Sequence, residues 1–351
     1  MGRKSRTLET RRTEVEKNPT IVFTKPREAV IENREKPVLE KGKLLVRTRK
    51  TLISTGTELT ALSGEFRPDS LWAKIIRYPM VMGYCNVGDV IDVGPEVDKA
   101  WIGQRVVSQG SHALYVSVDI RRTIAIQRET LSDEQAAFSN LATVAMNGVR
   151  RASVAWGEAV AVYGLGLLGQ FTVRFSRLCG ARPVCAVDVA ESRLRRLPED
   201  SAIVRVNPKV DDVATVVREH TSGRMADVVF EVTGNPNVIV EEFKCLKRQG
   251  RLVVVSSPRG ETLFDFCDYC NAHSFTIIGA HFESHPEHPT ADNPWTSARN
   301  AELFLDLVAD GELDLEPLVS HREPYTEAPR LYQELLRDRS EAMGVILEWS
   351  T

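Results

Sequence analysis

The chain has 351 residues, with 45 Lys and Arg against 48 Asp and Glu and a formal net charge of −3. This near balance excludes the basic domain that nucleic-acid binding needs and the polybasic cluster that draws proteins to anionic membranes. The length favours about two domains. Six cysteines at this low density predict reduced thiols in a cytoplasmic protein. We therefore expect a small molecule as partner, and neither nucleic acid nor a membrane.

The first part of the chain has the texture of an antiparallel β domain. Residues 1–19 are charged and contain no apolar segment, so they predict a flexible arm rather than a secretory signal. Over residues 20–145, short apolar runs alternate with turn residues, as between Ile21 and Ala61 and between Val81 and Val118. This alternation is typical of antiparallel sheet, and a helical pattern follows from Asp133.

The stretch from Ala159 to Asp188 predicts a strand, a glycine turn, a helix and a second strand. Its glycines Gly164, Gly166 and Gly169 have the G-x-G-x-x-G spacing of a dinucleotide site. The first permits a tight turn, the second lets the backbone approach a diphosphate, and the third allows the helix to pack closely on the strand. The diphosphate then lies at the helix N-terminus.

Asp188 ends the second strand and decides which cofactor we expect. A carboxylate here accepts hydrogen bonds from the adenosine ribose hydroxyls and repels a 2′-phosphate, which favours NAD over NADP. The nearby Arg193, Arg195 and Arg196 leave NADP open, because they could clasp a phosphate or form only a solvated helix face. The other residues expected to contact the cofactor are Arg193, Leu167, Leu168, Thr233 and Ser256.

Alternating β and α patterns continue through residues 146–284 and predict a doubly wound parallel sheet of six strands. The later strands are expected near Ala202–Val206 and from Asp227, Arg251 and Phe275. Beyond this domain, amphipathic helices at 298–310 and 328–337 precede a final apolar run. We expect residues 285–351 to return to the first domain.

Several motifs follow one another along the chain: STGTEL at 54–59, GYCNVGDVIDVG at 83–94, GQRV at 103–106, SHALYV at 111–116 and GVRRA ending at Ala152. With the glycine fingerprint, they resemble the medium-chain dehydrogenase/reductase superfamily of zinc-type alcohol dehydrogenases. STGTEL and the late NPWTSARN are most similar to its bacteriochlorophyllide dehydrogenase-like branch. The resemblance implies a GroES-like catalytic domain with an inserted Rossmann domain, NAD(P)-dependent oxidoreductase activity, and a homodimer or homotetramer.

The resemblance also implies where zinc ligands would stand. Zinc-bearing members have cysteine at the position of Thr55, histidine and glutamate at Tyr84 and Cys85, and a third ligand near Ser139. Threonine, tyrosine and serine do not normally bind Zn²⁺. The four-cysteine lobe of zinc members is missing too, since no cysteine lies between Cys85 and Cys179. We therefore expect no metal, neither a catalytic nor a structural zinc.

Without a Lewis acid, a developing oxyanion needs a hydrogen-bond or proton donor. Tyr84 is the first catalytic candidate, because the family's histidine at this position points into the cleft; alternatively, the ring only fills the vacated metal space. Thr55 and Thr57 are neighbouring donors. Glu58 stands at a position that is acidic in many relatives, where it supports the site, and as a lone carboxylate it could equally cap a turn.

Candidate substrate residues follow the sixth predicted strand, because ligands of doubly wound sheets bind beyond the carboxyl ends of the strands. His281 begins a histidine-rich run whose prolines prevent a regular helix, which argues against a metal cluster. Arg299 suits an anionic or polyhydroxylated group, and Trp295 supplies a flat wall or packs at a helix start. Trp72 lies in another pocket loop, residues 67–80.

Three functions remain open from the sequence. The leading one is zinc-independent hydride transfer between a nicotinamide and a secondary alcohol or ketone of a polar, cyclic metabolite. The second is NADPH-dependent reduction of a carbon–carbon double bond, as in quinone and enoyl reductases, which the lack of zinc ligands favours. The third is a catalytically inactive nucleotide-binding protein. Asp188 and the branch resemblance favour the first.

Overall fold

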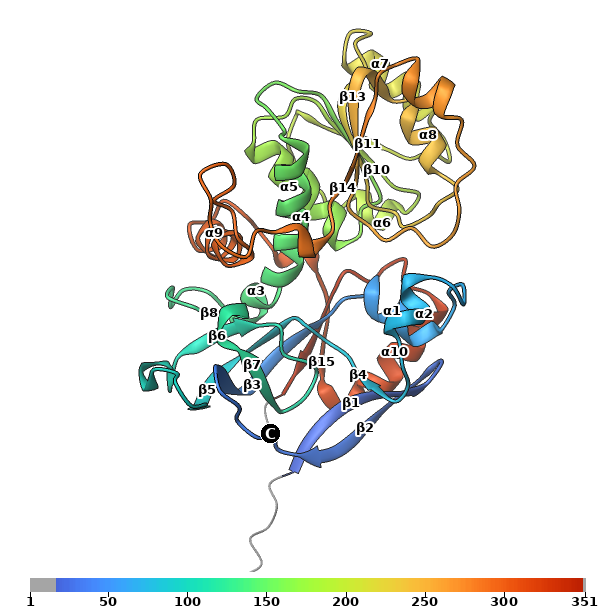
Figure 1. Cartoon of the computed structure of the whole chain (residues 1–351). Helices are drawn as coiled ribbons and strands as arrows, with labels where there is room; N and C mark the ends of the chain where they lie inside the picture. The colour runs from blue at the N-terminus through green and yellow to red at the C-terminus, as the bar shows by residue number, and fades with distance from the viewer. Residues whose placement is uncertain (1–16, 350–351) are drawn as a thin grey trace, which may run out of the picture.

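Antiparallel strands build the lower lobe of the computed structural model, which describes residues 17–349 (Figure 1). A seven-stranded sheet has the order β15-β16-β3-β5-β6-β8, with β7 paired to β3, and a smaller sheet has the order β2-β1-β4. The strands are β1 (Lys17–Lys25), β2 (Glu28–Glu35), β3 (Lys43–Ile53), β4 (Met80–Val81), β5 (Asn86–Val93), β6 (Arg105–Ser108), β7 (Tyr115–Asp119), β8 (Thr123–Ala125), β15 (Val319–Pro324) and β16 (Gly344–Glu348). The central strand β3 is largely buried, because β5, β7 and β16 all pair with it.

The structure and the predicted N-terminal arm differ at residues 17–19. These residues begin β1, where Lys17 is paired with Glu35 and Pro19 with Asn33. Residues 1–16 of the arm lie outside the described residues. Short helices complete this part of the chain: α1 (Thr57–Ser63), α2 (Leu71–Ile75) and α3 (Asp133–Ala137).

The C-terminal segment completes the lower lobe. β16 runs antiparallel to β3, with Ile346 opposite Leu52, and β15 pairs with β16 in parallel. The helix α10 (Ala328–Arg337) packs against β2 and buries Leu331 and Tyr332. Figure 1 accordingly shows the red C-terminal elements among the blue N-terminal strands.

A six-stranded parallel sheet with helices on both faces forms the upper lobe (Figure 1). Its order is β11-β10-β9-β12-β13-β14, so the doubly wound sheet expected from the sequence is confirmed. Every residue of β9 and β10 is buried, because a parallel sheet covered on both faces needs continuous apolar runs. The elements are β9 (Val160–Tyr163), α5 (Leu167–Leu178), β10 (Val184–Val187), α6 (Glu191–Leu194), β11 (Ile203–Val206), α7 (Val213–His220), β12 (Ala226–Glu231), α8 (Ile239–Phe243), β13 (Leu246–Val254) and β14 (Thr276–Gly279).

One helix joins the two lobes. α4 (Ser139–Ala152) continues through residues 145 and 146, where the sequence suggests a domain boundary. It packs against α5 and α9 (Ser297–Ala309), and the ring of Phe171 forms edge-to-face pairs with Phe138 and Phe304 at centroid distances of 6.1 and 5.7 Å. The lobes therefore meet across packed helices rather than a linker. None of the helices between residues 17 and 349 is long and apolar enough to cross a bilayer.

Candidate active site

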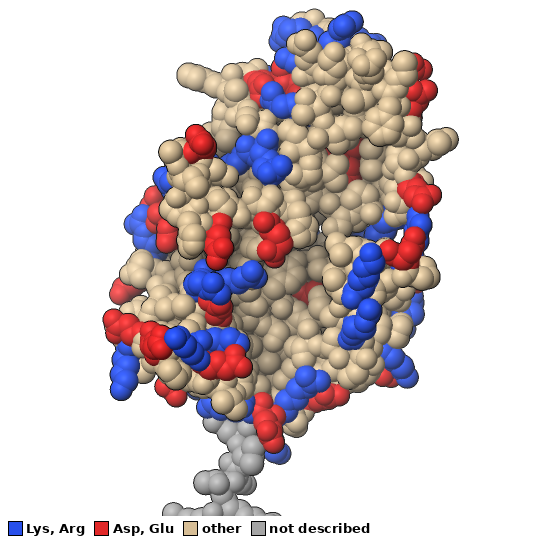
Figure 2. Space-filling model, in the orientation of Figure 1, with Lys and Arg blue, Asp and Glu red and all other residues tan. Residues whose placement is uncertain are grey.

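A cleft of about 970 Å³ lies between the two lobes, and Figure 2 shows the surface hollowed there. The upper lobe contributes the glycine turn and the carboxyl ends of its strands, and the lower lobe contributes residues 54–57 and Tyr84. On the outer face shown in Figure 2, basic and acidic side chains intermix. The face in this view therefore carries no large patch of a single charge sign.

The glycine turn combines a left-handed residue with two close backbone approaches. Gly164 adopts a left-handed φ of 90°, and a Cβ there would lie 2.8 Å from the backbone nitrogen of Thr233. A Cβ on Gly169 would lie 1.8 Å from the carbonyl oxygen of Gly164. Gly166 has open space around it, and as N-cap of α5 it places no side chain over the helix end. The amide groups of the first turn therefore face the cleft, where they can bind an anion.

Asp188 follows β10 and lines the cleft beside this turn. Its carboxylate accepts a hydrogen bond from the Leu165 amide at 2.7 Å and lies 3.3 Å from Arg193 Nη1. Arg193 lines the cleft as well, whereas Arg196 donates to the backbone carbonyl of Pro317. Of the three arginines that leave NADP open, Arg193 is thus the one that lines the cleft.

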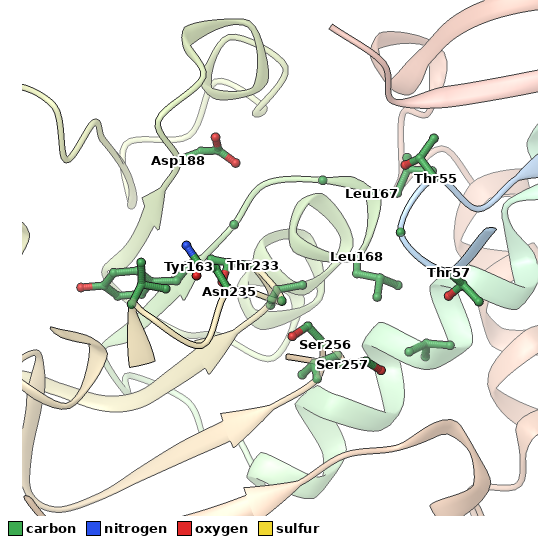
Figure 3. Close-up of a pocket in the computed structure, with 18 of the residues that line it drawn as sticks. Thr55, Thr57, Tyr163, Leu167, Leu168, Asp188, Thr233, Asn235, Ser256 and Ser257 are labelled. Carbon is green, nitrogen blue, oxygen red and sulfur yellow. The ribbon is translucent and has the colours of Figure 1, made fainter. Parts of the chain in front are cut away.

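A buried glutamate that the sequence reasoning missed organises the facing wall. Glu231 ends β12, and its carboxylate accepts hydrogen bonds from the Thr233 amide and hydroxyl, both at 2.7 Å, and from the Ser256 hydroxyl. Thr233 and Ser256 line the cleft in these positions, as Leu167 and Leu168 do (Figure 3). The sequence does contain a signal for this residue, since Glu231 stands inside the apolar run DVVFEVTG. A carboxylate buried in a strand needs hydrogen-bond partners nearby, which indicates an organised polar site.

The Tyr84 hydroxyl forms the lower-lobe wall together with three other hydroxyls. It lies 2.5 Å from Ser54 Oγ and 3.3 Å from Thr57 Oγ1. Thr55 and Thr57 line the same wall, and Figure 3 shows them on the opposite side of the cavity from Asp188. Burial raises the pKa of Tyr84 above its ordinary value, and the neighbouring thiol of residue 85 adds to this rise. The phenol is therefore neutral at physiological pH and can donate a hydrogen bond.

Glu58 lies behind this wall rather than in the cleft. It is fully buried, accepts hydrogen bonds from the Ser54 amide at 2.8 Å and from the Tyr332 hydroxyl, and lies 3.0 Å from His112 Nε2. These partners occupy the carboxylate, so it cannot meet a ligand. The placement corrects the expectation of a catalytic Glu58: the residue holds the loop that carries the hydroxyls.

The residues at the family's zinc positions do not form a zinc-binding set. Thr55 and Tyr84 offer neutral hydroxyls, and Asn140, rather than its neighbour Ser139, lines the cleft at the third position. Cys85 is 1% exposed within the hydrophobic core, and burial raises the pKa of its thiol well above the ordinary value. Within residues 17–349, no group of three or more His, Cys, Asp or Glu side chains could hold a metal ion.

The structure separates the four substrate candidates into two pairs. Trp72 and His281 line the cleft. Trp295 and Arg299 are not among the described residues that line it. The guanidinium carbons of Arg150 and Arg299 lie over the Trp295 ring, 3.3 and 4.1 Å from its centroid. Cation–π stacking satisfies these groups away from the cleft, which corrects the expected roles of Trp295 as a pocket wall and Arg299 as an anion contact.

Three polar residues that the sequence did not single out line the lower-lobe part of the cleft. Arg122 Nη1 donates to Gln109 Oε1 at 3.0 Å, and Asn140 Nδ2 donates to the Tyr84 carbonyl at 2.5 Å. No local pattern marks these residues, because they come from separate turns and from α4.

Two family models match the chain: "Alcohol dehydrogenase GroES-like domain" over residues 40–150 and "Zinc-binding dehydrogenase" over residues 168–295. The (R,R)-butanediol dehydrogenase of Bacillus subtilis is 30% identical over 64% of this chain and 73% of its own length. The chain belongs to the medium-chain dehydrogenase/reductase superfamily. As a member of this superfamily it is an NAD(P)-dependent oxidoreductase.

Other relatives of this medium-chain dehydrogenase/reductase cover more of the chain. Sorbitol dehydrogenase 2 of Saccharomyces cerevisiae is 25% identical over 94% of this chain and 98% of its own length. An Escherichia coli oxidoreductase of unknown specificity has a TM-score of 0.81 at 19% identity, covering 96% of this chain and 100% of its own. An alcohol dehydrogenase from E. coli CFT073, complexed with NADH, has a TM-score of 0.79 at 18% identity, covering 95% and 99%. These structural likenesses establish the shared fold.

Proposed function

We propose that this medium-chain dehydrogenase/reductase transfers hydride between NAD and a secondary alcohol or ketone of a polar, cyclic metabolite, without zinc. One observation carries the proposal: Tyr84 lines the cleft, and its neutral hydroxyl lies within hydrogen-bond distance of Ser54 and Thr57. The resemblance to the family implies a zinc-binding histidine at this position. The relatives named above are sorbitol and butanediol dehydrogenases, which supports an alcohol as the substrate class.

The upper lobe has the residues to hold the cofactor, which supplies the hydride acceptor or donor when bound. The glycine turn and the N-terminus of α5 suit its diphosphate, and Thr233 and Ser256 border the same space. Asp188, fixed by the Leu165 amide, is placed to accept hydrogen bonds from the adenosine ribose. This arrangement supports NAD as the preferred cofactor.

In this proposal, Tyr84 stabilises the substrate oxygen in place of a zinc ion. A neutral phenol can donate a hydrogen bond to the substrate oxygen and stabilise its developing negative charge, and a preorganised donor of this kind contributes about 3 kcal/mol. Ser54 and Thr57 lie within hydrogen-bond distance of the phenol oxygen, so either hydroxyl can relay a proton through it. Glu58 keeps these hydroxyls in place by holding the Ser54 amide.

The lining of the cleft supports a polar substrate. Gln109, Arg122 and His281 offer hydrogen bonds, and Trp72 offers a flat apolar face. A hydroxylated ring has hydroxyl groups that can bond to the polar side chains and an apolar face that can pack on Trp72. The branch resemblance, which implies a cyclic substrate, agrees with this combination.

The first test is a fluorescence titration of metal-stripped protein with NADH and NADPH, together with elemental analysis of untreated protein. Tighter binding of NADH and no stoichiometric zinc support the proposal. Cyclic polyols, ketones and conjugated enones are then assayed by nicotinamide absorbance. Stoichiometric zinc whose removal abolishes turnover refutes zinc independence. If the protein reduces only enones, and with NADPH, the double-bond reductase is the function instead. If it binds the cofactor tightly but turns over no substrate, it is the inactive nucleotide-binding protein.

We also propose a cytoplasmic homodimer that pairs through the edge of the upper sheet. β14 is an edge strand, and Leu263, Phe266 and Ile277, in this strand and the segment before it, are 97%, 69% and 46% exposed. An apolar sheet edge favours pairing with a second copy. The six cysteines are unpaired, which suits a reducing compartment. Light scattering should show a dimer that Ile277→Lys weakens; a monomeric wild type refutes the proposal.

A further inference from the structure

A cluster of polar side chains lies outside the cleft, where α4 packs against α9 and against the turn Phe282–Ser284. It contains Arg150 near the end of α4, His285 after the turn, and Trp295, Arg299 and Asn300 around the start of α9. We call these five residues the Trp295 cluster. None of them is among the described residues that line the cleft. The proposed hydride transfer therefore does not use this cluster.

Two positive charges meet in the Trp295 cluster without a carboxylate. The guanidinium carbons of Arg150 and Arg299 both lie over the Trp295 ring. Arg150 Nε donates to Asn300 Oδ1 at 2.8 Å, and Arg299 Nη1 donates to the Pro294 carbonyl at 3.4 Å, but within residues 17–349 neither guanidinium forms an ion pair. Burial lowers the pKa of Arg150 to about 10, and the charge of Arg299 adds to this lowering. An aromatic face does not neutralise these charges, so an anion would stabilise them.

Asn300 adds a buried hydrogen-bond donor to the two charges. Its side chain is fully buried, and because Arg150 Nε can only donate, the amide oxygen is the atom that faces Arg150. The Nδ2 atom lies beside the same guanidinium, since the two amide atoms share one carbon. Nδ2 has no hydrogen-bond partner among the described residues. A buried donor without a partner is unfavourable, which indicates that an acceptor binds here.

His285 adds a buried acceptor. Its Nδ1 lies 2.8 Å from the Phe282 carbonyl, which can only accept, so Nδ1 carries the proton of the neutral ring. Burial lowers the pKa of His285, and the nearby charge of Arg150 lowers it too. The ring is therefore neutral at physiological pH, and Nε2 is an acceptor. This atom is buried without a partner in the part of the chain that the structure describes.

We propose that the Trp295 cluster binds a phosphate group, either as inorganic phosphate or as a phosphate ester. Phosphate oxygens match the planar forks of Arg150 and Arg299 and can accept from Asn300 Nδ2. Hydrogen phosphate also has an O–H group that can donate to His285 Nε2, whereas sulfate and carboxylates have no such proton at neutral pH. This site is separate from the cleft, so the inference goes beyond the proposed function and does not depend on it.

The test is isothermal titration calorimetry of the wild-type chain with inorganic phosphate, glucose 6-phosphate and sulfate, in an excess of ADP-ribose that occupies the cleft. The titrations are repeated with Arg299→Gln, whose exposed position should tolerate the change. In Asn300→Asp, the side chain still accepts from Arg150, but a negative charge replaces the free amide donor. Arg248→Gln is the matched control, because Arg248 is exposed on β13 and does not line the cleft.

We expect the wild type and Arg248→Gln to bind a phosphate compound with a Kd of about 1 mM or lower. Arg299→Gln should raise this Kd about tenfold or more, and Asn300→Asp should abolish binding. Phosphate should also raise the melting temperature of the wild type but not that of Asn300→Asp, because only a chain that binds the ligand is stabilised by it. The comparison of inorganic phosphate with glucose 6-phosphate shows which source of the group the site prefers.

Four results overturn the inference. The wild type binds neither phosphate compound, or Arg299→Gln and Asn300→Asp both keep the wild-type Kd. Binding that ADP-ribose abolishes assigns the phosphate to the cleft instead. Equally tight binding of sulfate shows that the cluster selects only for charge and not for a phosphate group. If the wild type fails to bind ADP-ribose, the proposed function is in doubt, and the two variants still show whether phosphate binds at the Trp295 cluster.

Discussion

Replacing Glu242 with glutamine should stabilise the protein at neutral and alkaline pH. Glu242 is fully buried on α8, and neither of its carboxylate oxygens has a hydrogen-bond partner among the described residues. Burial raises the pKa of Glu242 to about 9, and the buried carboxylate of Glu231 adds to the rise. The native protein therefore keeps this carboxyl protonated at pH 7, whereas the unfolded chain ionises it.

The magnitude follows from proton linkage. Between the ordinary value of 4.5 and about 9, the native state binds one more proton at Glu242 than the unfolded state does. The free energy of unfolding therefore falls by about 1.4 kcal/mol for each pH unit in this window, and the loss by pH 7 is about 3 kcal/mol. Glutamine has the same shape as the protonated acid and binds no proton, so the Glu242→Gln variant escapes this loss. The two proteins should be equally stable at the acid end of the window.

The assay is urea unfolding of both proteins, followed by tryptophan fluorescence, at several pH values between about 5.5 and 8. The difference in free energy of unfolding should grow in favour of Glu242→Gln as the pH rises. Glu241→Gln is the matched control, because Glu241 is exposed and paired with Lys244 at 2.7 Å. The reasoning is refuted if Glu242→Gln keeps the wild-type pH dependence.

Three further changes test the site. Tyr84→Phe should lower kcat/KM roughly hundredfold or more, with an unchanged Kd for NADH, because it removes the oxyanion donor; steady-state kinetics near the wild-type rate would contradict the assigned role. Asp188→Asn should shift the ratio of NADPH to NADH affinity toward NADPH by about tenfold, since it removes a charge that repels a 2′-phosphate; an unchanged ratio in fluorescence titrations argues against it. Gly169→Ala should lower the melting temperature, because its Cβ would lie 1.8 Å from the carbonyl of Gly164. Gly166→Ala, whose Cβ meets nothing within 4 Å, should fold normally but bind NADH more weakly; equal melting temperatures of the two variants would contradict this pairing.

The sequence could predict the parts of the site that depend on short-range pattern. The glycines of residues 164–169 stand in one turn, and the φ of Gly164 and the close contact of Gly169 are local requirements that only glycine meets. The strands of the upper lobe read as continuous apolar runs, because both faces of the parallel sheet are covered. Motif order along the chain was enough to indicate the superfamily.

Burial and long-range contact could not be predicted in the same way. Glu58 belongs to the STGTEL motif, but only the fold shows that Tyr332 and His112 enclose its carboxylate. Trp295 and Arg299 follow the expected strand, yet neither lines the cleft, and the Trp295 ring packs against Arg150 from α4. Each outcome depends on a partner from a distant part of the chain.

By itself, the sequence determined the doubly wound lobe, the antiparallel lobe and the glycine turn, because hydrophobic period and glycine spacing act between near neighbours. Tertiary structure alone decided which charges share the cleft. Arg339 and Thr55 are 284 positions apart and meet only because the C-terminal segment returns to the lower lobe. The ionisation and hydrogen bonding of a side chain depend on the atoms around it, and the tertiary fold determines which atoms these are.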